Sequence, residues 1–255
     1  MSEANKTLVM IPTYNEVDNV AKLAHQIIDL QLPCDILFID DNSPDGTGEK
    51  LDRIKGMQGG INGNPLQVIH VIHRSGKLGV GSAHKTGIEY AYARGYDVLV
   101  TMDCDGTHNP KDIPEMVAFT QGVVNYDIVV GTRHLWKESL EGWSIWRKFV
   151  THMGHLLTQF LLNMPYDATG AFRAYHLTRL PKEVFGKVES NGYSFFFESL
   201  SILNANGYKI QEIPIVLEAR AAGHSKLKTS DLIMALLFMV KLRLNMIFRK
   251  SKYMM

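Results

Sequence analysis

The sequence predicts an α/β protein with a Rossmann-like, mainly parallel central sheet and helices on both faces, followed by C-terminal amphipathic helices. In the first half of the chain, short apolar runs alternate with segments of helical periodicity. Such alternation is typical of a parallel sheet that is covered by helices. The chain has 255 residues, of which 45% are hydrophobic, so it is long enough to bury the core of one such domain.

The elements of the first half follow one another as strand, polar turn and helix. Strands are expected at residues 7–11, 35–40, 66–72, 97–102 and 127–131, and helices at residues 17–30, 47–55, 80–94 and 113–122. Ligands of such sheets bind beyond the carboxyl ends of the strands, where the loops converge. We therefore expect the chemistry of this protein in the loops that follow the strands.

The pattern is looser after Gly131. A helix is expected at residues 145–163, a short strand at 169–175, a helix at 196–206, a strand at 210–217 and a further helix from residue 229. Pro214 cannot donate a hydrogen bond within a sheet, so its strand is predicted at an edge or a bulge. We expect one α/β domain over residues 1–228, and a C-terminal amphipathic helix over residues 229–255 that meets a membrane surface or a partner.

Charge and cysteine content exclude several classes of protein. A nucleic-acid-binding surface that works by bulk charge needs a basic excess, and the formal net charge here is only +1. No nucleic-acid partner is therefore expected. Cys34 and Cys104 are too few for a disulfide framework and lack the paired spacing of a zinc site. The polar N-terminal residues contain no apolar segment of a secretory signal, which favours the cytoplasm.

The longest apolar stretches are residues 145–164 and 232–248, and charged residues interrupt both. A charge at the centre of a membrane costs about 2.5–3.5 kcal/mol on insertion scales. Amphipathic helices that lie on a membrane bury only one face. We therefore expect peripheral contact with the cytoplasmic face of a membrane, and the alternative is packing against the core or a partner subunit.

The acidic triplet Asp103-Cys104-Asp105 follows an apolar run of a predicted central strand. Charges at the end of a buried strand raise the free energy of the fold unless they have partners. Carboxylate oxygens are hard ligands that suit Mg²⁺ or Mn²⁺, with phosphate oxygens and water completing the shell. The alternative is a purely structural role, because aspartates also cap helices and form Asx-turns. The neighbouring loops favour metal binding by Asp103 and Asp105.

The loops after the first two predicted strands contain groups that suit a nucleotide. Pro12-Thr13-Tyr14-Asn15-Glu16 follows the first strand, and Asp40-Asp41 ends the second. Asp41 can accept a hydrogen bond from a nucleobase N–H, and Tyr14 offers a flat stacking surface. Guanine and uracil both present such an N–H, so Asp41 does not distinguish them. Asp45-Gly46-Thr47 is interpreted as a turn that leads into a helix.

A glycine-containing segment, His73 to Ala83, follows the third predicted strand and opens a helix. Glycines let a backbone approach a diphosphate, a helix N-terminus favours anions, and Lys77 adds charge. Gly79-Val80-Gly81 alone also fits an ordinary turn. It is not the dinucleotide fingerprint, which follows a first strand and has a third glycine.

Basic residues that suit phosphate groups lie later in the chain. Arg133 follows the fifth predicted strand, and Arg147 shares a helix face with Thr151. The segment from Arg220 to Lys226 combines flexible and hydrogen-bonding residues between two cations, so it could close over a diphosphate as a lid. The alternative for any single arginine is a solvated helix charge.

The histidines show no Cys/His spacing that would build a zinc site. His152 and His155 share a helix face, but three-residue spacing alone does not indicate a metal. We interpret most histidines as structural or surface residues.

Together, these motifs resemble those of the family 2 glycosyltransferases of the GT-A fold, and within them the polyprenol-phosphate (dolichol-phosphate) mannose synthases. The resemblance covers about residues 8–228. It rests on Pro12-Thr13-Tyr14-Asn15-Glu16, Asp40-Asp41-Asn42-Ser43-Pro44-Asp45-Gly46-Thr47, Lys77-Leu78-Gly79-Val80-Gly81-Ser82-Ala83, Asp103-Cys104-Asp105, Gly131-Thr132-Arg133, Thr169-Gly170-Ala171-Phe172-Arg173, and Arg220 with Gly223, Ser225 and Lys226. The last two sets point to the polyprenol-phosphate branch.

The resemblance implies a metal-dependent, inverting transferase that moves a hexose, with mannose from GDP-mannose favoured, to a polyprenyl phosphate. The implied site residues fall into groups by ligand: Pro12, Tyr14, Glu16 and Asp41 for the nucleotide, Asp103 and Asp105 for Mg²⁺ or Mn²⁺, Arg133 and Arg147 for the acceptor phosphate, and Arg220 and Lys226, beside Lys77, for the donor diphosphate. Thr107 stands where the family often has a glutamine, which is a departure near the metal.

A phosphate acceptor makes a protein base unnecessary, because its second pKa near 6 leaves it largely ionised at pH 7. Asp105, Arg133, Arg147, Arg220 and Lys226 would then act by positioning and by neutralising charge. A sugar hydroxyl would instead require a base, for which an acidic residue near Glu198 is the candidate.

Two alternatives remain open for the function. One is a related family 2 enzyme that uses a UDP-sugar and a saccharide or lipid acceptor. The other is a non-catalytic nucleotide-sugar-binding subunit. A membrane partner subunit or a homo-oligomer is compatible with either.

Overall fold

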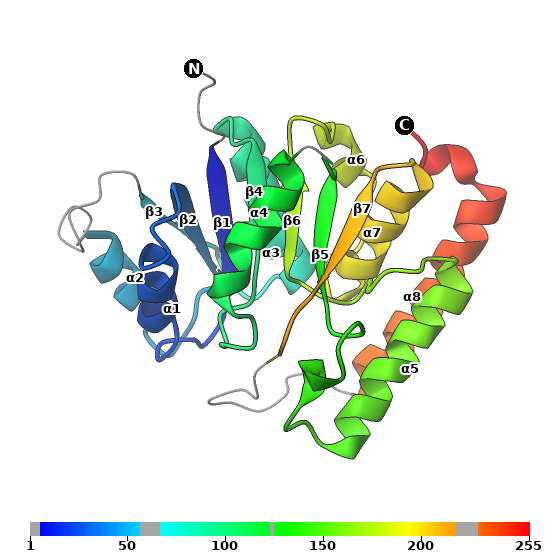
Figure 1. Ribbon diagram of the computed structural model, residues 1–255, viewed down its shortest axis with the longest axis horizontal. Helices are drawn as coiled ribbons and strands as arrows, with labels where there is room; N and C mark the ends of the chain where they lie inside the picture. Colours follow the sequence, from blue (N-terminus) through cyan, green and yellow to red (C-terminus); the bar gives the residue numbers. More distant parts are fainter. Residues whose placement is uncertain (1–5, 57–66, 123–124, 218–228) are drawn as a thin grey trace.

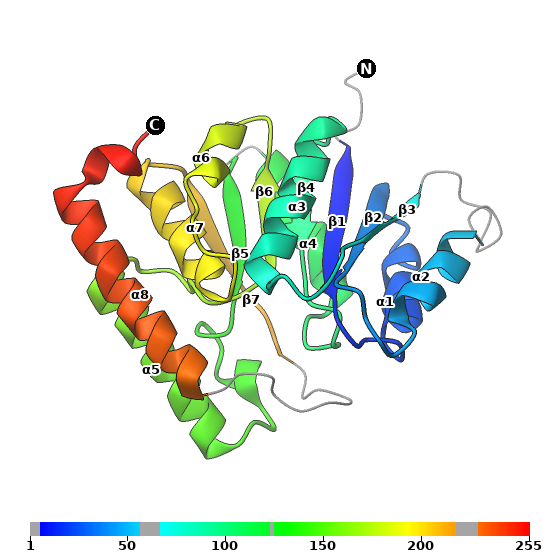
Figure 2. The same cartoon turned by 180° about the vertical axis from the view of Figure 1, so that it is seen from behind.

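The computed structural model confirms the predicted class: a seven-stranded, mainly parallel sheet lies between layers of helices (Figures 1 and 2). The structure describes residues 6–56, 67–122, 125–217 and 229–255. The strand order is β3-β2-β1-β4-β6-β5-β7. The strands are β1 (Thr7–Thr13), β2 (Cys34–Asp40), β3 (Ile69–His73), β4 (Val98–Thr101), β5 (Ile128–Thr132), β6 (Arg173–His176) and β7 (Ile210–Pro214).

Strand β1 shows why the sheet is covered on both faces. Its side chains alternate, so Leu8 and Met10 belong to one hydrophobic cluster while Val9 and Ile11 belong to the other, and all four are fully buried. The first cluster includes residues of α3 (Val80–Ala93), α6 (Lys182–Gly186) and α7 (Ser194–Ala205). The second includes residues of α1 (Val20–Ile28), α2 (Thr47–Gly56) and α4 (Ile113–Gln121).

Strand β6 runs antiparallel to both of its neighbours, β4 and β5. The sequence predicts a short strand here, but its hydrophobic pattern does not predict the direction. The reversal places the start of β6 at the edge where β4 and β5 end. The segment before β6, including Asp167, therefore lies among the loops that follow the parallel strands.

Strand β7 is an edge strand, as Pro214 predicts. It pairs with β5 in parallel, with Pro214 opposite Thr132. The proline has no N–H to donate, and the next residue, Ile215, donates its N–H to the Thr132 carbonyl at 2.9 Å. The strand ends at Pro214 rather than at the predicted residue 217.

The long helices α5 (Ile145–Leu162) and α8 (Thr229–Phe248) lie side by side at one end of the sheet (Figures 1 and 2). The rings of Phe197 and Phe238 lie 5.9 Å apart and connect α8 to α7. Beyond α8, the Tyr253 carbonyl accepts a hydrogen bond from Asn206 at 2.8 Å. Among the described residues, no helix is long and apolar enough to span a membrane. The proposed division at residue 228 stays a prediction.

Candidate functional site

The loops after β1 and β2 are joined by short hydrogen bonds. The backbone N–H of Asn15 donates to Ser43 Oγ at 3.0 Å, and that of Glu16 donates to Thr47 Oγ1 at 2.9 Å. Asp45 accepts hydrogen bonds from the N–H and the hydroxyl of Thr47, at 3.0 and 2.6 Å. The interpretation of Asp45 to Thr47 as a turn before a helix is thus confirmed, and these bonds fix the segment that contains Tyr14.

The acidic triplet follows β4 at the same edge of the sheet. Asp105 Oδ1 accepts hydrogen bonds from the N–H and the hydroxyl of Thr107, at 3.1 and 2.7 Å. The backbone N–H of Asp103 donates to His108 Nδ1 at 3.0 Å, and the His108 ring stacks on Phe172. The Asx-turn that the sequence offered as the alternative to a metal site is therefore present. It also fixes the direction of the Asp105 carboxylate, so a turn and a metal-binding role are compatible.

Asp41, the predicted partner of the nucleobase, forms an ion pair with Arg74. Arg74 Nε donates to Asp41 Oδ1 at 2.5 Å. The same guanidinium donates to Ser82 Oγ at 2.7 Å and to the Gly79 carbonyl at 3.3 Å. Arg74 thus joins the loop after β2 to the glycine-containing segment, a role that the sequence pattern did not predict. The assignment of Asp41 to a nucleobase stays a prediction.

The predicted nucleotide residues Tyr14 and Lys77 come together in the structure. Lys77 Nζ lies 4.3 Å from the centre of the Tyr14 ring. Pro12 lies within β1 opposite Ile39 of β2, and Asn19 donates a hydrogen bond to the Glu16 carboxylate at 2.8 Å. The cation–π contact places a positive charge beside a flat ring, which suits a diphosphate next to a base.

The glycines of the segment have a structural role as well. A Cβ atom on Gly79 would lie 2.4 Å from the Asn191 carbonyl oxygen, and one on Gly81 would lie 2.7 Å from that of Gly192. Gly79 also has φ +97°, which favours glycine. The close approach of two parts of the chain therefore explains these glycines without a diphosphate.

Glu198, near which the sequence places the candidate base for a hydroxyl acceptor, is fully buried in α7. Its Oε1 accepts the N–H of Glu189 at 3.0 Å and its Oε2 that of Ser190 at 2.8 Å. These bonds hold the segment that faces Gly79 and Gly81. The geometry supports a structural role for Glu198 and gives it no path to an acceptor hydroxyl.

Arg133, after β5, forms an ion pair with Asp167, a residue that sequence analysis did not select. Arg133 Nε donates to Asp167 Oδ2 at 2.9 Å, and the carboxylate has no exposed surface. Burial alone would raise the pKa of Asp167, but the charge of Arg133 holds that pKa well below its ordinary value. A Cβ on Gly170 would lie 3.2 Å from Arg133 Nη2, so glycine makes room for the guanidinium.

Arg147 lies in the first turn of α5, where the Ser144 hydroxyl accepts its N–H at 3.3 Å as a helix cap. Its guanidinium carbon lies 3.5 Å from the centre of the Trp143 ring. Arg220 and Lys226, predicted at the donor diphosphate, lie outside the described residues.

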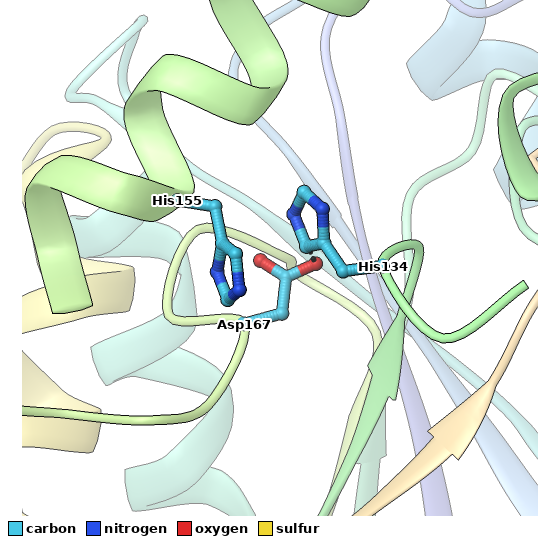
Figure 3. A group of neighbouring side chains, drawn as sticks. All are labelled: His134, His155 and Asp167. Atoms are coloured by element: carbon cyan, nitrogen blue, oxygen red, sulfur yellow. Dashed lines mark ion pairs between the residues drawn. The ribbon is translucent and has the colours of Figure 1, made fainter.

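Two histidines approach Asp167 from different elements, and Figure 3 shows the three side chains pointing toward one another. His134 Nε2 lies 3.7 Å from Asp167 Oδ2. The His134 and His155 rings stack with centroids 3.9 Å apart and planes 10° from parallel. Burial lowers the pKa of His134 to about 4 and lowers that of His155 as well. Sequence spacing missed this group because its members come from separate segments.

Comparisons with known proteins show which family the chain resembles. A family model described as "Glycosyl transferase family 2" matches residues 8–179. An "Undecaprenyl-phosphate mannosyltransferase" of Micrococcus luteus is 33% identical over 223 residues, which are 87% of each chain. A "Polyprenol monophosphomannose synthase" of Mycolicibacterium smegmatis is 34% identical over 230 residues, 89% of this chain and 83% of the relative.

Solved structures at lower identity share the fold. Glucosyl-3-phosphoglycerate synthase from Mycobacterium tuberculosis, in complex with Mn²⁺, UDP and phosphoglyceric acid, has TM-score 0.65 and 17% identity, covering 98% of this chain and 79% of that one. Mannosyl-3-phosphoglycerate synthase from Rubrobacter xylanophilus has TM-score 0.64 and 15% identity, covering 97% and 75%. A mannosyltransferase from Pyrobaculum calidifontis, in complex with GDP-mannose and Mn²⁺, has TM-score 0.54 and 16% identity, covering 88% and 59%.

The Arg133–Asp167 pair yields a prediction about stability. Asp167→Asn keeps the shape of the side chain but leaves the guanidinium without its anionic partner, so we expect a loss of about 3–5 kcal/mol in the free energy of unfolding. Urea titration measures it. Glu189→Gln is the matched control, because Glu189 pairs with Lys252 at the surface, where such pairs contribute about 1 kcal/mol or less. Equal losses in the two variants would contradict the prediction.

Proposed function

The chain belongs to the family 2 glycosyltransferases, and from that premise we propose that it transfers mannose from GDP-mannose to a polyprenyl phosphate, with inversion at the anomeric carbon. The names of the two similar relatives support this choice of sugar and acceptor. One observation supports the reaction type. The Asp103/Asp105 turn, the loops after β1 and β2, and Arg133 all lie at the carboxyl edge of one sheet.

Asp103 and Asp105 would hold the divalent ion, Mg²⁺ or Mn²⁺. Both side chains are partly exposed and follow β4 at the carboxyl edge of the sheet, where a diphosphate would lie, and the bonds from Thr107 fix Asp105. Two of the structural neighbours contain Mn²⁺. A bound divalent ion would neutralise charge that develops on the leaving diphosphate. Thr107, bonded to Asp105, would orient this carboxylate.

The donor nucleotide would lie against the first and second loops. Tyr14 offers a ring for stacking, Asp41 an acceptor for a base N–H, and Lys77, held over Tyr14, a charge for the diphosphate. Pro12 and Glu16 frame the first loop. Arg220 and Lys226, outside the described residues, would add charge to the departing diphosphate.

The acceptor phosphate would be held by Arg133 and Arg147. A phosphate monoester is largely ionised at pH 7, so its oxygen can attack without a protein base. The two arginines would align this anion with the donor and offset the repulsion between the two. A sugar hydroxyl would need a base, and the Glu198 carboxylate is buried and accepts two backbone hydrogen bonds. This also favours a phosphate acceptor.

The proposal predicts that Asp105→Ala lowers the rate of mannosyl transfer at least 100-fold, because the diphosphate would lose its ion. Excess chelator should do the same to the natural chain. Asp29→Asn, at an exposed position after α1, is the control and should keep full activity. A transfer assay with radiolabelled GDP-mannose measures each rate. Transfer at full rate in excess chelator would overturn the metal role, and transfer only with UDP-sugars would favour the alternative.

We further propose that α5 and α8 lie on the cytoplasmic surface of the membrane that contains the acceptor. Their exposed apolar side chains include Ile145, Phe160 and Phe248, which are 87%, 84% and 80% exposed. The two helices lie side by side (Figure 1). Exposed apolar surface of this kind marks an interaction site, and amphipathic helices bury it at a lipid interface.

The membrane proposal predicts binding to anionic phospholipid vesicles. Replacing Trp146 and Phe160 together by serine should reduce the bound fraction at least tenfold, because a buried aromatic side chain contributes about 1.5–3 kcal/mol. Val68→Ser, an exposed apolar position near the opposite edge of the sheet, should leave binding unchanged. Flotation of the vesicles measures the fraction. Absence of the natural chain from the floated fraction would contradict the proposal and point to a protein partner for this surface.

A further inference from the structure

We infer that His134, His155 and Asp167 form a site for a transition-metal ion such as Zn²⁺, separate from the aspartates after β4. One ligand atom from each side chain lies within 4.8 Å of the other two. Two imidazole nitrogens and one carboxylate oxygen are a ligand set that suits Zn²⁺ more than Mg²⁺. The binding of such an ion requires neither the donor nor the acceptor proposed above.

The unsatisfied nitrogens are the first argument for an ion. The His134 side chain is only 9% exposed, and neither of its ring nitrogens has a hydrogen-bond partner among the described residues. Within that same part of the chain, His155 Nδ1 has none either. A buried polar atom without a partner costs about 1–3 kcal/mol. An ion that is coordinated by one nitrogen of each ring would remove part of this cost.

The spacing of the ligand atoms is the second argument. The two imidazoles stack with their planes 10° from parallel, and an ion bound to a ring nitrogen lies in the plane of that ring, so a shared ion requires one ring to turn out of the stack. Ligand atoms around a tetrahedral Zn²⁺ lie about 3.4 Å apart, given bonds near 2.0–2.1 Å. His134 Nε2 and Asp167 Oδ2, at 3.7 Å, are already close to that spacing. Rotation of one ring would complete the group.

The local charge permits a cation, although Arg133 opposes it. Arg133 neutralises Asp167, but Glu212 Oε1 accepts the Asp167 N–H at 2.6 Å and places a second carboxylate beside the first. A metal ion would therefore share Asp167 with Arg133. We expect weaker binding than at a closed structural zinc site, and a coordination position left for water or an anion such as phosphate.

Gln159 is placed to support His155. Its amide nitrogen lies 3.0 Å from His155 Nε2. A 180° turn of this amide would let its oxygen accept a hydrogen bond from Nε2–H, the outer hydrogen bond typical of metal-bound histidine, and would replace the 3.4 Å bond from the amide nitrogen to the Pro165 carbonyl. Nδ1 would then carry the lone pair for the ion.

The site is distinct from Asp103 and Asp105. His134 follows β5 and Asp103 follows β4, with β6 between these strands. Two strand spacings separate them by about 10 Å. Changes at Asp105 should therefore leave the histidine site intact.

The test is titration of the full chain with Zn²⁺ by calorimetry, with Co²⁺ absorption as a report on imidazole ligation. His134→Phe and His155→Phe keep a flat ring in the stack but remove the ligand, so each should bind at least tenfold more weakly. His152→Phe is the matched control. His152 lies on α5, as His155 does, and its ring is 5.4 Å from that of His134, but it offers no atom to the group. Asp105→Ala should also retain this Zn²⁺ binding.

Circular dichroism and cooperative melting establish that each variant is folded, and His155→Phe alone suffices if His134→Phe does not fold. Equal Zn²⁺ affinity in His155→Phe and the natural chain would overturn the inference. Binding that disappears in Asp105→Ala but persists in His155→Phe would also overturn it. So would a natural chain that takes up no Zn²⁺, which would indicate that water satisfies the ring nitrogens.

Discussion

The buried ion pair between Arg133 and Asp167 connects the parts of the molecule that surround the proposed acceptor site. Arg133 follows β5, Asp167 precedes the reversed strand β6, and the Asp167 N–H donates a hydrogen bond to Glu212 of β7. His134 and His155 bring α5 to the same carboxylate. Because a buried carboxylate must be paired, the position of Arg133 is fixed before any phosphate arrives. A charge held in place in this way costs little reorganisation when an anion binds, which is the condition for electrostatic catalysis.

The alternation of apolar runs and helical segments predicted most of the fold, because a parallel sheet covered on both faces needs that pattern. Pro214 predicted the edge position of β7 for the same kind of local reason. The direction of β6 could not be predicted, since a strand of four residues carries the same pattern in either direction. Helix α6 has only five residues, too few to show a helical period, and it was not predicted. These differences arise where tertiary pairing, rather than local sequence, decides the structure.

The candidate site divides in the same way. Residues in short motifs after strands, such as Asp103, Asp105 and Tyr14, were selected correctly as neighbours of one sheet edge, because the carboxyl ends of parallel strands converge. Arg74, Asp167 and the histidine group were missed. Arg74 and Asp167 each interact with a partner that is distant in the sequence: Arg74 with Asp41, and Asp167 with Arg133, 34 residues away. The glycines near Gly79 show the converse, because a motif that fits a diphosphate also serves the packing of the chain.

The proposed enzyme handles anions with fixed positive charge and a divalent ion, and it needs no general base. The most direct measurement is the product of a transfer assay that compares polyprenyl phosphate with the corresponding free polyprenol, using GDP-mannose and Mn²⁺. Since the mannose of GDP-mannose is α-linked, we expect a β-mannosyl phosphate from the phosphorylated acceptor and no product from the alcohol. An α-linked product, or equal transfer to the free alcohol, would contradict it.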